Sequence, residues 1–274
     1  VVFYILLLER GYTMNISFRE ACFIKKLPNM EGSFGYLATH KTLPNGTVIK
    51  VINNLTKEKE STIRELIGEK KIEGSGYPID EYSVDNKLQG FIMPYYSHSH
   101  TFDYIVNRDM FTHKERLKAS IDCTRQLKEL HNKGFFLNDI ALSNSLIDKD
   151  GGHLIDFDSA TKRSPKKTES HYELTLNSKM LRPNYNTDKL KQALTNLSII
   201  YGINFEEVIK DSTTDVNSLF SLFKDNKEIF NLLDSYLSCD SSKPYFDVLI
   251  DTLEDEEKVM FESAKIYRKT NSLV

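Results

Sequence analysis

The strand-like and helix-like segments of this sequence are separated along the chain. Over the first ~100 residues, short apolar stretches alternate with turn signals such as PNMEGSFG and LPNG, which is typical of hairpins. Beyond residue 112 the apolar residues recur at helical spacing instead. This change of period predicts an α+β fold with two lobes, joined near the PYYSHSH stretch.

We expect the first lobe, residues 1–96, to be rich in strands and to carry one main helix. The second lobe, residues 97–274, should be reduced in size and mostly helical. The sequence predicts strands at residues 36–40, 47–52, 81–84 and 88–96, helices at 57–73, 112–131 and throughout 188–268, and a loop at 162–187.

The composition excludes several classes of protein. The 274 residues suffice for two lobes, and the net charge of −3 argues against a nucleic-acid partner. Three cysteines lie far apart without a CxxC pair, which favours a reducing, cytoplasmic compartment and no structural zinc. The apolar run VVFYILLL is too short for a transmembrane segment. We expect residues 1–14 to be an edge strand or an over-long gene start; a membrane-targeting leader is the alternative.

Two aspartates and one asparagine mark the most informative stretch, residues 135–162. Asp139 and Asn144 are five residues apart, and Asp156 follows twelve residues later, each beside a strand-like apolar segment. Carboxylate and amide oxygens are hard ligands that suit Mg²⁺. Together the three predict a site for Mg²⁺ and a phosphorylated nucleotide, although either aspartate alone could be a turn or cap residue.

A glycine-rich turn and a strand lysine form a second set of candidates. Gly32 and Gly35 lie between two predicted strands, where backbone N–H groups can approach phosphate oxygens; alternatively these glycines only form the turn. Lys50 lies in the apolar strand TVIKV, where a buried charge needs a partner. The expected partner is an acid on the following helix: Glu69 lies nineteen residues later, and Glu65 lies one turn earlier on the same face.

Between residues 24 and 160 the sequence resembles the eukaryotic-type protein kinase family in a series of motifs that follow the family's order. MEGSFGYL resembles the Gly-rich loop, with Met30 for the first glycine and Leu37 for the valine, and VIK resembles the strand of the paired lysine. EKKI resembles the helix of the paired glutamate, and GFIMPYY resembles the strand entering the hinge. ELHNKGFFLNDIALSN and DFD are similar to the catalytic loop and the metal motif. The resemblance implies a protein-kinase-like two-lobe fold.

The resemblance also implies ATP and Mg²⁺ as cofactors, with Mn²⁺ as a substitute, and gives roles to the catalytic loop (135–147) and the metal motif (156–158). Asp139 would accept or orient the proton of the acceptor hydroxyl, and Asn144 and Asp156 would hold the metal. Lys50, paired with Glu69, would contact the α- and β-phosphates. The other implied nucleotide-binding residues are Gly32, Ser33, Phe34 and Gly35 at the phosphates, Met93 as gatekeeper, and Pro94 and Tyr96 beside the adenine.

Several positions depart from the family pattern. Leu137 and Asn138 stand where the family has His and Arg, so the usual partner of a phosphorylated activation loop is missing. Ala141 and Ser143 leave out a positive charge that protein kinases place near the transferred phosphate. Asp158 replaces the glycine of D-F-G, which the metal motif of the aminoglycoside and choline kinase branch also lacks. The basic residues that could supply the missing charge are Lys162, Arg163, Lys166 and Lys167.

The sequence therefore predicts an ATP- and Mg²⁺-dependent phosphotransferase, as a Ser/Thr-type protein kinase of an atypical branch. Phosphorylation of the activation loop would not be the switch: activity would be constitutive, or would depend on a ligand, partner or host factor. The reduced second lobe resembles atypical kinases of intracellular bacteria or large viruses, so a bacterial effector in a host cytosol is one interpretation. The alternatives are a small-molecule or lipid kinase and a pseudokinase scaffold without transfer activity. Asp188 is preferred over Asp215 as the aspartate that opens the central helix of the second lobe.

Overall fold

The computed structural model describes residues 14–22, 24–32, 35–162, 174–176, 179–181, 184–211, 216–238 and 240–270. The chain divides into two compact units, Val1–Ser97 and His98–Val274, and this boundary lies one residue from the position expected from the sequence. The fold class is α+β. A mixed six-stranded sheet lies in the first unit, and most of the helices lie in the second.

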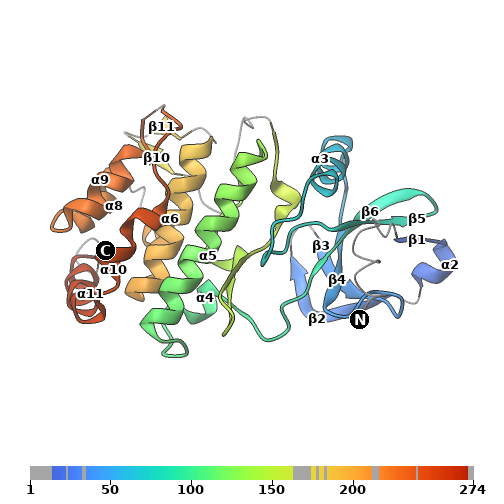
Figure 1. Cartoon of the computed structure of the whole chain (residues 1–274), viewed down its shortest axis with the longest axis horizontal. Coiled ribbons are helices and arrows are strands. Elements are labelled where there is room, and N and C mark those ends of the chain that lie inside the picture. Colours follow the sequence, from blue (N-terminus) through green and yellow to red (C-terminus); the bar gives the residue numbers. More distant parts are fainter. Residues whose placement is uncertain are drawn as a thin grey trace. The chain divides into compact units, whose positions relative to one another are not determined.

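The sheet of the first unit has the strand order β1-β5-β6-β4-β3-β2, and its neighbours are antiparallel except for β1 and β5 (Figure 1). Its strands are β1 (Met14–Ile16), β2 (Lys25–Gly32), β3 (Gly35–Thr39), β4 (Thr47–Ile52), β5 (Asp80–Val84) and β6 (Lys87–Pro94). β3 to β6 confirm the four expected strands, although the last ends at Pro94 and not at residue 96. Met14 belongs to an edge strand, whereas residues 1–13 lie outside the described residues.

The expected turn at residues 28–35 is shorter than the sequence predicts, because β2 continues to Gly32. Pro28 lies within β2, where the sequence indicated a turn. β2 is an edge strand, and its pairing with β3 is irregular between Lys26 and Glu31. Proline is tolerated on edge strands and at bulges because no ladder partner is lost there. A short helix, α2 (Phe18–Ala21), was not predicted.

The main helix of the first unit, α3 (Lys57–Gly68), is shorter than the predicted helix at 57–73. It begins at Thr56, whose side chain accepts a hydrogen bond from the Lys59 N–H. It ends because the Leu66 carbonyl accepts the Glu69 N–H at 3.0 Å and the buried Tyr77 hydroxyl at 2.9 Å. The prediction of a further turn was therefore wrong.

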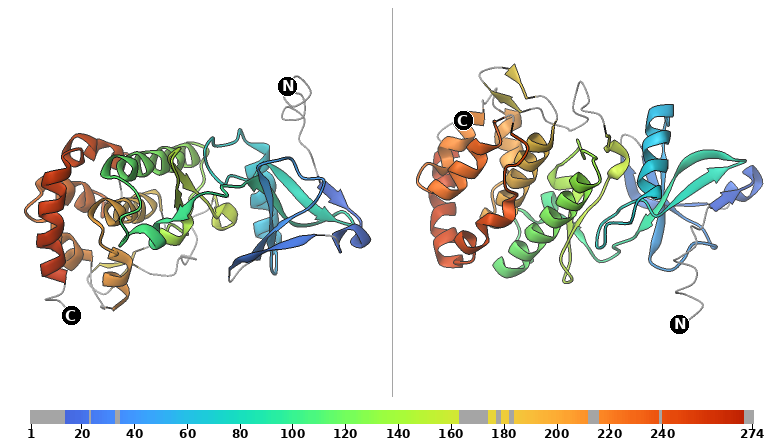
Figure 2. Two further views of the ribbon diagram at one scale, coloured as in Figure 1. Left: turned by 90° about the horizontal axis from the view of Figure 1, so that it is seen from below. Right: turned by 45° about the horizontal axis from the view of Figure 1, so that its top comes forward.

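Two apolar clusters cover opposite faces of the sheet, as the alternation of side chains along a strand requires. On one face Val48, Phe91 and Met93 pack with Ile63 of α3, and the ribbon of α3 lies against the sheet (Figure 2). The other face carries a second cluster, which includes Ile49. α3 thus covers the face that holds Val48 and the alternate residues of β4.

The second unit is mainly helical and carries a small sheet of β7 (His100–Thr101), β8 (Ser145–Ile147) and β9 (Gly152–Leu154). Its α-helices are α4 (Phe102–Ile105), α5 (His113–Asn132), α6 (Tyr185–Tyr201), α7 (Phe205–Asp211), α8 (Val216–Phe220), α9 (Lys227–Ser235), α10 (Ile250–Leu253) and α11 (Glu256–Thr270). The predicted helix at 112–131 is confirmed as α5, and the described residues from 184 to 270 contain helices and turns without a strand. A hairpin of β10 (Thr175–Leu176) and β11 (Lys179–Met180) lies in the expected loop.

α6 is the central helix of this unit: α5 and α11 pack against it, and all of its residues from Asn186 to Tyr201 are buried (Figures 1 and 2). Several of its polar side chains form hydrogen bonds inside the core. For example, Asn196 Nδ2 donates to Thr124 Oγ1 of α5 at 2.9 Å. Among the described residues, no helix is both long enough and apolar enough to cross a bilayer.

A capping box begins α5, and its loss should be measurable. Thr112 Oγ1 accepts the Glu115 N–H at 3.3 Å, while Glu115 Oε2 accepts the Thr112 N–H at 2.8 Å. Thr112→Ala should lower the free energy of unfolding by about 1 kcal/mol in urea titrations at pH 7. Thr112→Ser keeps the hydroxyl and serves as the control. A loss of equal size in both variants would contradict the capping role.

The effect of Thr112→Ala should shrink in acid. Hydrogen bonds from Thr112 hold the pKa of Glu115 below its ordinary value. A carboxyl whose pKa is lowered by folding stabilises the folded state above its unfolded pKa, and this contribution disappears as the pH falls through the lowered value. The difference between wild type and variant should therefore be full at pH 7 and smaller near pH 3.

Candidate active site

Asp139 and Asn144, two of the residues singled out from the sequence, are in direct contact. Asn144 Nδ2 donates to the Asp139 carbonyl at 2.9 Å and to Asp139 Oδ2 at 3.0 Å. Both residues are buried. The contact forms because the backbone turns between them: the Asn144 N–H donates to the Ala141 carbonyl at 3.0 Å, and the 3₁₀ helix η1 (Leu142–Asn144) follows.

Asp156 is brought to Asn144 by the β8–β9 hairpin. The hairpin pairs Ser145 with Leu154, and the Ile155 N–H donates to the Asn144 carbonyl at 3.0 Å. Asp156 follows immediately, with φ 70° and ψ 49°, and precedes the 3₁₀ helix η2 (Phe157–Ser159). Aspartate tolerates this left-handed conformation better than most residues do. Asn144 and Asp156 therefore lie at the same end of the hairpin.

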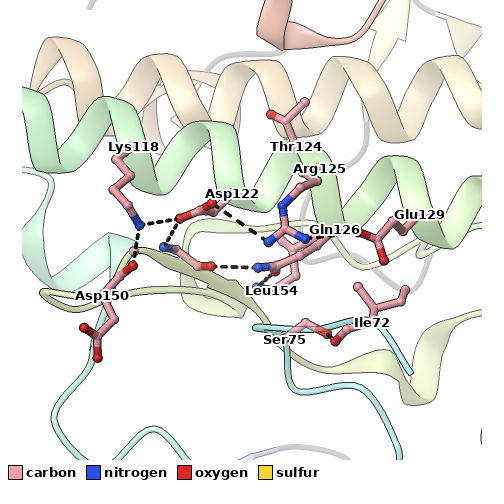
Figure 3. Close-up of polar contacts among 12 residues, drawn as sticks. Ile72, Ser75, Lys118, Asp122, Thr124, Arg125, Gln126, Glu129, Asp150 and Leu154 are labelled. Atoms are coloured by element: carbon pink, nitrogen blue, oxygen red, sulfur yellow. Dashed lines mark hydrogen bonds and ion pairs between the residues drawn. The ribbon is translucent and has the colours of Figure 1, made fainter. Parts of the chain in front are cut away.

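α5 holds this hairpin in place (Figure 3). Gln126 Nε2 donates to the Gly152 carbonyl at 2.8 Å, and Gln126 Oε1 accepts the Leu154 N–H at 2.7 Å. Lys118 Nζ donates to Asp122 Oδ2 at 3.0 Å and also to the Asp150 carbonyl. A side chain at Gly152 could not be accommodated, because a Cβ there would lie 2.1 Å from the Ala119 carbonyl oxygen of α5.

Asp188 supports the backbone at residues 137 and 138, just before Asp139. It lies in the first turn of α6 and is buried, as expected of the aspartate that opens the central helix. Its Oδ2 accepts the Leu137 N–H at 2.7 Å, and its Oδ1 accepts the Asn138 N–H at 3.3 Å. The alternative, Asp215, lies outside the described residues.

His131 and Tyr245 extend this support. His131 Nε2 lies 3.1 Å from Asp188 Oδ2, and its Nδ1 lies 2.9 Å from the Tyr245 hydroxyl. Burial and the nearby charge of Asp188 raise the pKa of the Tyr245 phenol, so the hydroxyl stays protonated and can donate to Nδ1. In that arrangement Nε2 carries the hydrogen and donates to Asp188.

The sequence interpretation missed Glu206 and His131 as supporting residues. Glu206, in the first turn of α7, is buried, and its Oε1 accepts the Leu142 N–H at 2.5 Å. No sequence signal marks Glu206, because its partner is a backbone amide 64 residues away. His131 is the polar residue at the end of the apolar stripe of α5, and that position was the available signal.

The donor set of the loop fits a magnesium ion. Both bonds of the Asn144 Nδ2 go to Asp139, so the amide oxygen Oδ1 faces away from Asp139, and no described residue donates to it. Together with the Asp156 carboxylate it supplies two hard oxygen ligands, as is usual where phosphates and water complete the Mg²⁺ shell. No group of three His, Cys, Asp or Glu side chains suited to a metal occurs among the described residues.

Two of the candidates for nucleotide binding in the first unit, Lys50 and Met93, share one face of the sheet. Lys50 pairs with Leu37 on β3 and with Phe91 on β6, so these side chains project to the same side. Met93 is buried on that side, in the cluster that α3 covers. Pro94 ends β6, and Tyr96 is half-buried two residues later.

The glycine-rich turn has a packing reason of its own. Gly32 and Gly35 are paired at the end of the β2–β3 hairpin, whereas Ser33 and Phe34 lie outside the described residues. A Cβ at Gly35 would lie 2.1 Å from the Val51 carbonyl oxygen on β4. Close approach of the neighbouring strand therefore requires this glycine whether or not phosphate binds.

Glu69 does not lie on the helix where the sequence predicted it. It is the residue after the end of α3, has an extended backbone (φ −90°, ψ 161°) and is exposed. The expectation that Glu69 and Glu65 share one helical face was therefore wrong, and the reason is the early end of α3 described above. Glu69 contributes to a cavity of about 450 Å³ next to the turn at Gly46.

The residues that depart from the family pattern have different surroundings. Asp158 is buried within η2, next to the buried Phe157. Lys162 is exposed, with its Nζ 4.8 Å from the centre of the Phe135 ring. The other three basic candidates, Arg163, Lys166 and Lys167, lie outside the described residues.

Comparison with known proteins adds no family for this chain. No protein-family model matches it, and no curated protein matches it. Its function must therefore be argued from the motifs and from the geometry of the loop.

Proposed function

We propose that the chain is an ATP- and Mg²⁺-dependent phosphotransferase that modifies a Ser or Thr hydroxyl of a protein. One observation carries the proposal: Asn144 donates to Asp139, and no described residue donates to its Oδ1, at the hairpin end where Asp156 begins its left-handed turn. A base candidate and two oxygen ligands are thus gathered from two segments of one loop region. The buried hydrogen bond from the Leu137 N–H to Asp188 holds the backbone just before Asp139, and this favours a preorganised site.

The chemistry asks the chain mainly for positioning and for electrostatic stabilisation. In the proposal the Asp139 carboxylate orients the acceptor hydroxyl and takes its proton, and the Asn144 amide restrains the rotation of that carboxylate. Asn144 Oδ1 and the Asp156 carboxylate hold the metal. Bound Mg²⁺ would neutralise charge on the phosphate oxygens. Lys50 would contact the α- and β-phosphates.

A small-molecule acceptor is the second candidate. It is favoured by Asp158, which stands where protein kinases have the glycine of D-F-G, as in the aminoglycoside and choline kinase branch. A protein kinase should label itself, or a generic protein substrate, with radioactive phosphate from ATP. A small-molecule kinase should transfer phosphate only when its metabolite is added. In either case a ligand or host factor would act as the switch, so both assays are run with and without host lysate.

Binding of Mg-ATP should be tested before transfer. Wild type should melt at a higher temperature with Mg-ATP than with ATP and EDTA, since a ligand that binds only the folded state stabilises it by ~2.7 kcal/mol at 100 times Kd. Asp156→Asn should lose most of the metal-dependent part of this shift. Asp150→Asn, an exposed aspartate on the same hairpin, is the matched control.

Two results would contradict the proposal. A shift without transfer to any acceptor would replace the enzyme with a nucleotide-binding scaffold. No shift with Mg-ATP, in the presence or absence of lysate, would reject nucleotide binding altogether.

A further inference from the structure

We infer that Asn138 and Ser159 form a clamp that holds the Asp156 turn in position. The loop that contains Asp156, here called the metal loop, then needs no phosphorylated residue to adopt its conformation. The inference rests on the proposed function, because it concerns how the same site is regulated. Asn138 and Ser159 are positioning residues in it: they act through Asp156 and touch neither metal nor nucleotide.

The clamp consists of two hydrogen bonds between the segment at residues 137–138 and Ser159, one donated from each side. Asn138 Nδ2 donates to the Ser159 carbonyl at 3.1 Å. Ser159 Oγ donates to the Leu137 carbonyl at 2.7 Å, and the Asp156 carbonyl oxygen lies 3.3 Å from the same hydroxyl. Asn138 and Ser159 are both buried, so water does not compete for these bonds.

The clamp continues a short antiparallel ladder. Phe136 and Thr161 form a β-bridge with N–H···O distances of 2.8 and 3.0 Å. Two residues further along each segment, Asn138 lies opposite Ser159. There the ladder cannot continue through the backbone of Asn138, because its φ is 65° and its N–H donates to Asp188 instead. The side chains of Asn138 and Ser159 take over the pairing.

The Asp156 turn needs such a restraint. Asp156 is left-handed at φ 70°, a conformation that costs a non-glycine residue free energy unless its surroundings hold it. The two clamp bonds fix Ser159, the last residue of the turn that begins at Asp156, to the segment at residues 137–138. Asn138 also connects this turn to Asp188 of α6, so the metal loop is tied to the central helix of its unit.

This connection uses uncharged groups where the kinase family uses an arginine and a phosphate. A phosphate acts through its charge and must be added after synthesis. The amide of Asn138 and the hydroxyl of Ser159 are present in the protein as synthesised. The clamp therefore predicts that the metal loop of the unphosphorylated protein already has the conformation that binds metal. A ligand or partner would then regulate another step.

The test measures the loop directly by hydrogen–deuterium exchange of a peptide covering residues 155–161, in the full chain. Ser159→Ala should accelerate exchange in this peptide about tenfold, the factor expected for losing a buried hydrogen bond. Ser159→Thr keeps the hydroxyl and should restore slow exchange. Ser120→Ala removes a buried hydroxyl that bonds within α5 and is the matched control. Phosphatase treatment of wild type should leave the exchange unchanged.

A second measurement addresses the metal. The ratio of the ATP dissociation constants without and with Mg²⁺ should fall about tenfold in Ser159→Ala, a loss typical of one hydrogen bond, while the metal-free constant changes less than about twofold. Asn138→Gly removes the amide but tolerates the positive φ, and it should reproduce both effects if Ser159→Ala does not fold.

The outcomes are decisive in each case. Exchange in Ser159→Ala no faster than in Ser120→Ala, failure of Ser159→Thr to restore it, or an unchanged magnesium ratio would each overturn the inference. If wild type binds ATP neither with nor without Mg²⁺, the proposed function fails. The role of Asn138 and Ser159 in positioning Asp156 for a metal then fails with it. The exchange data then still decide whether the clamp holds the turn.

Discussion

Asp139→Asn should lower the rate of phosphoryl transfer by about 10²–10⁴-fold, the usual contribution of a positioned general base. The amide has the size of the carboxylate and can still accept the hydrogen bond from Asn144 Nδ2, so the loop should keep its shape. It cannot take a proton from the acceptor. The rate is measured as transfer of labelled phosphate from ATP under single-turnover conditions, with saturating Mg²⁺.

Two controls separate a catalytic effect from a folding effect. Asp150→Asn changes an exposed aspartate of the same loop region and should transfer phosphate at the wild-type rate. The Mg-ATP melting shift of Asp139→Asn should match that of wild type, since Asp139 is not among the proposed metal ligands. Transfer at more than about a tenth of the wild-type rate would remove Asp139 from the role of base.

Asp188→Ala should lower the free energy of unfolding by about 3–5 kcal/mol, the loss typical of removing one partner from a buried charged network. The carboxylate of Asp188 accepts from two backbone amides, at Leu137 and Asn138, and from His131. Without it the two amides would be buried with no acceptor in its place. Since a domain is stable by only about 5–15 kcal/mol, the loss should be obvious in urea titrations.

Asp188→Asn and Asp234→Ala complete the series. Asp188→Asn keeps one oxygen acceptor and should lose less stability than Asp188→Ala. Asp234→Ala truncates an exposed aspartate of α9 and should change the free energy of unfolding by less than about 0.5 kcal/mol. A loss below about 1 kcal/mol in Asp188→Ala would mean that the loop does not depend on this carboxylate.

Much of the secondary structure follows from local sequence pattern. The apolar stripe of α5 and the alternation in β4 predict these elements almost to the residue. A helix that buries one face and a strand that buries alternate side chains each have apolar residues at a regular spacing. The preference for Asp188 over Asp215 also came from spacing, and Asp188 does lie in the first turn of the buried central helix. Local pattern works here because each element has a consistent period along its length.

Other features depend on partners distant in the sequence. α3 ends where the hydroxyl of Tyr77, eleven residues from Leu66, binds the Leu66 carbonyl, and this removes Glu69 from the helix. Gly35 is required by the carbonyl of Val51 on the adjacent strand. The local sequence pattern predicts neither effect, since both arise from atoms that come into contact only after folding.

In the candidate site, too, some features follow from the sequence and others from the tertiary structure. The sequence by itself determined which groups are present, namely the carboxylates of Asp139 and Asp156 and the amide of Asn144, because their chemical type and order are legible in the chain. Only the tertiary structure decided that Asn144 turns its nitrogen to Asp139, and that Asn138 Nδ2 donates to the Ser159 carbonyl. Side-chain orientation depends on hydrogen bonds between segments, and these bonds exist only once the hairpin and α6 have brought the segments together.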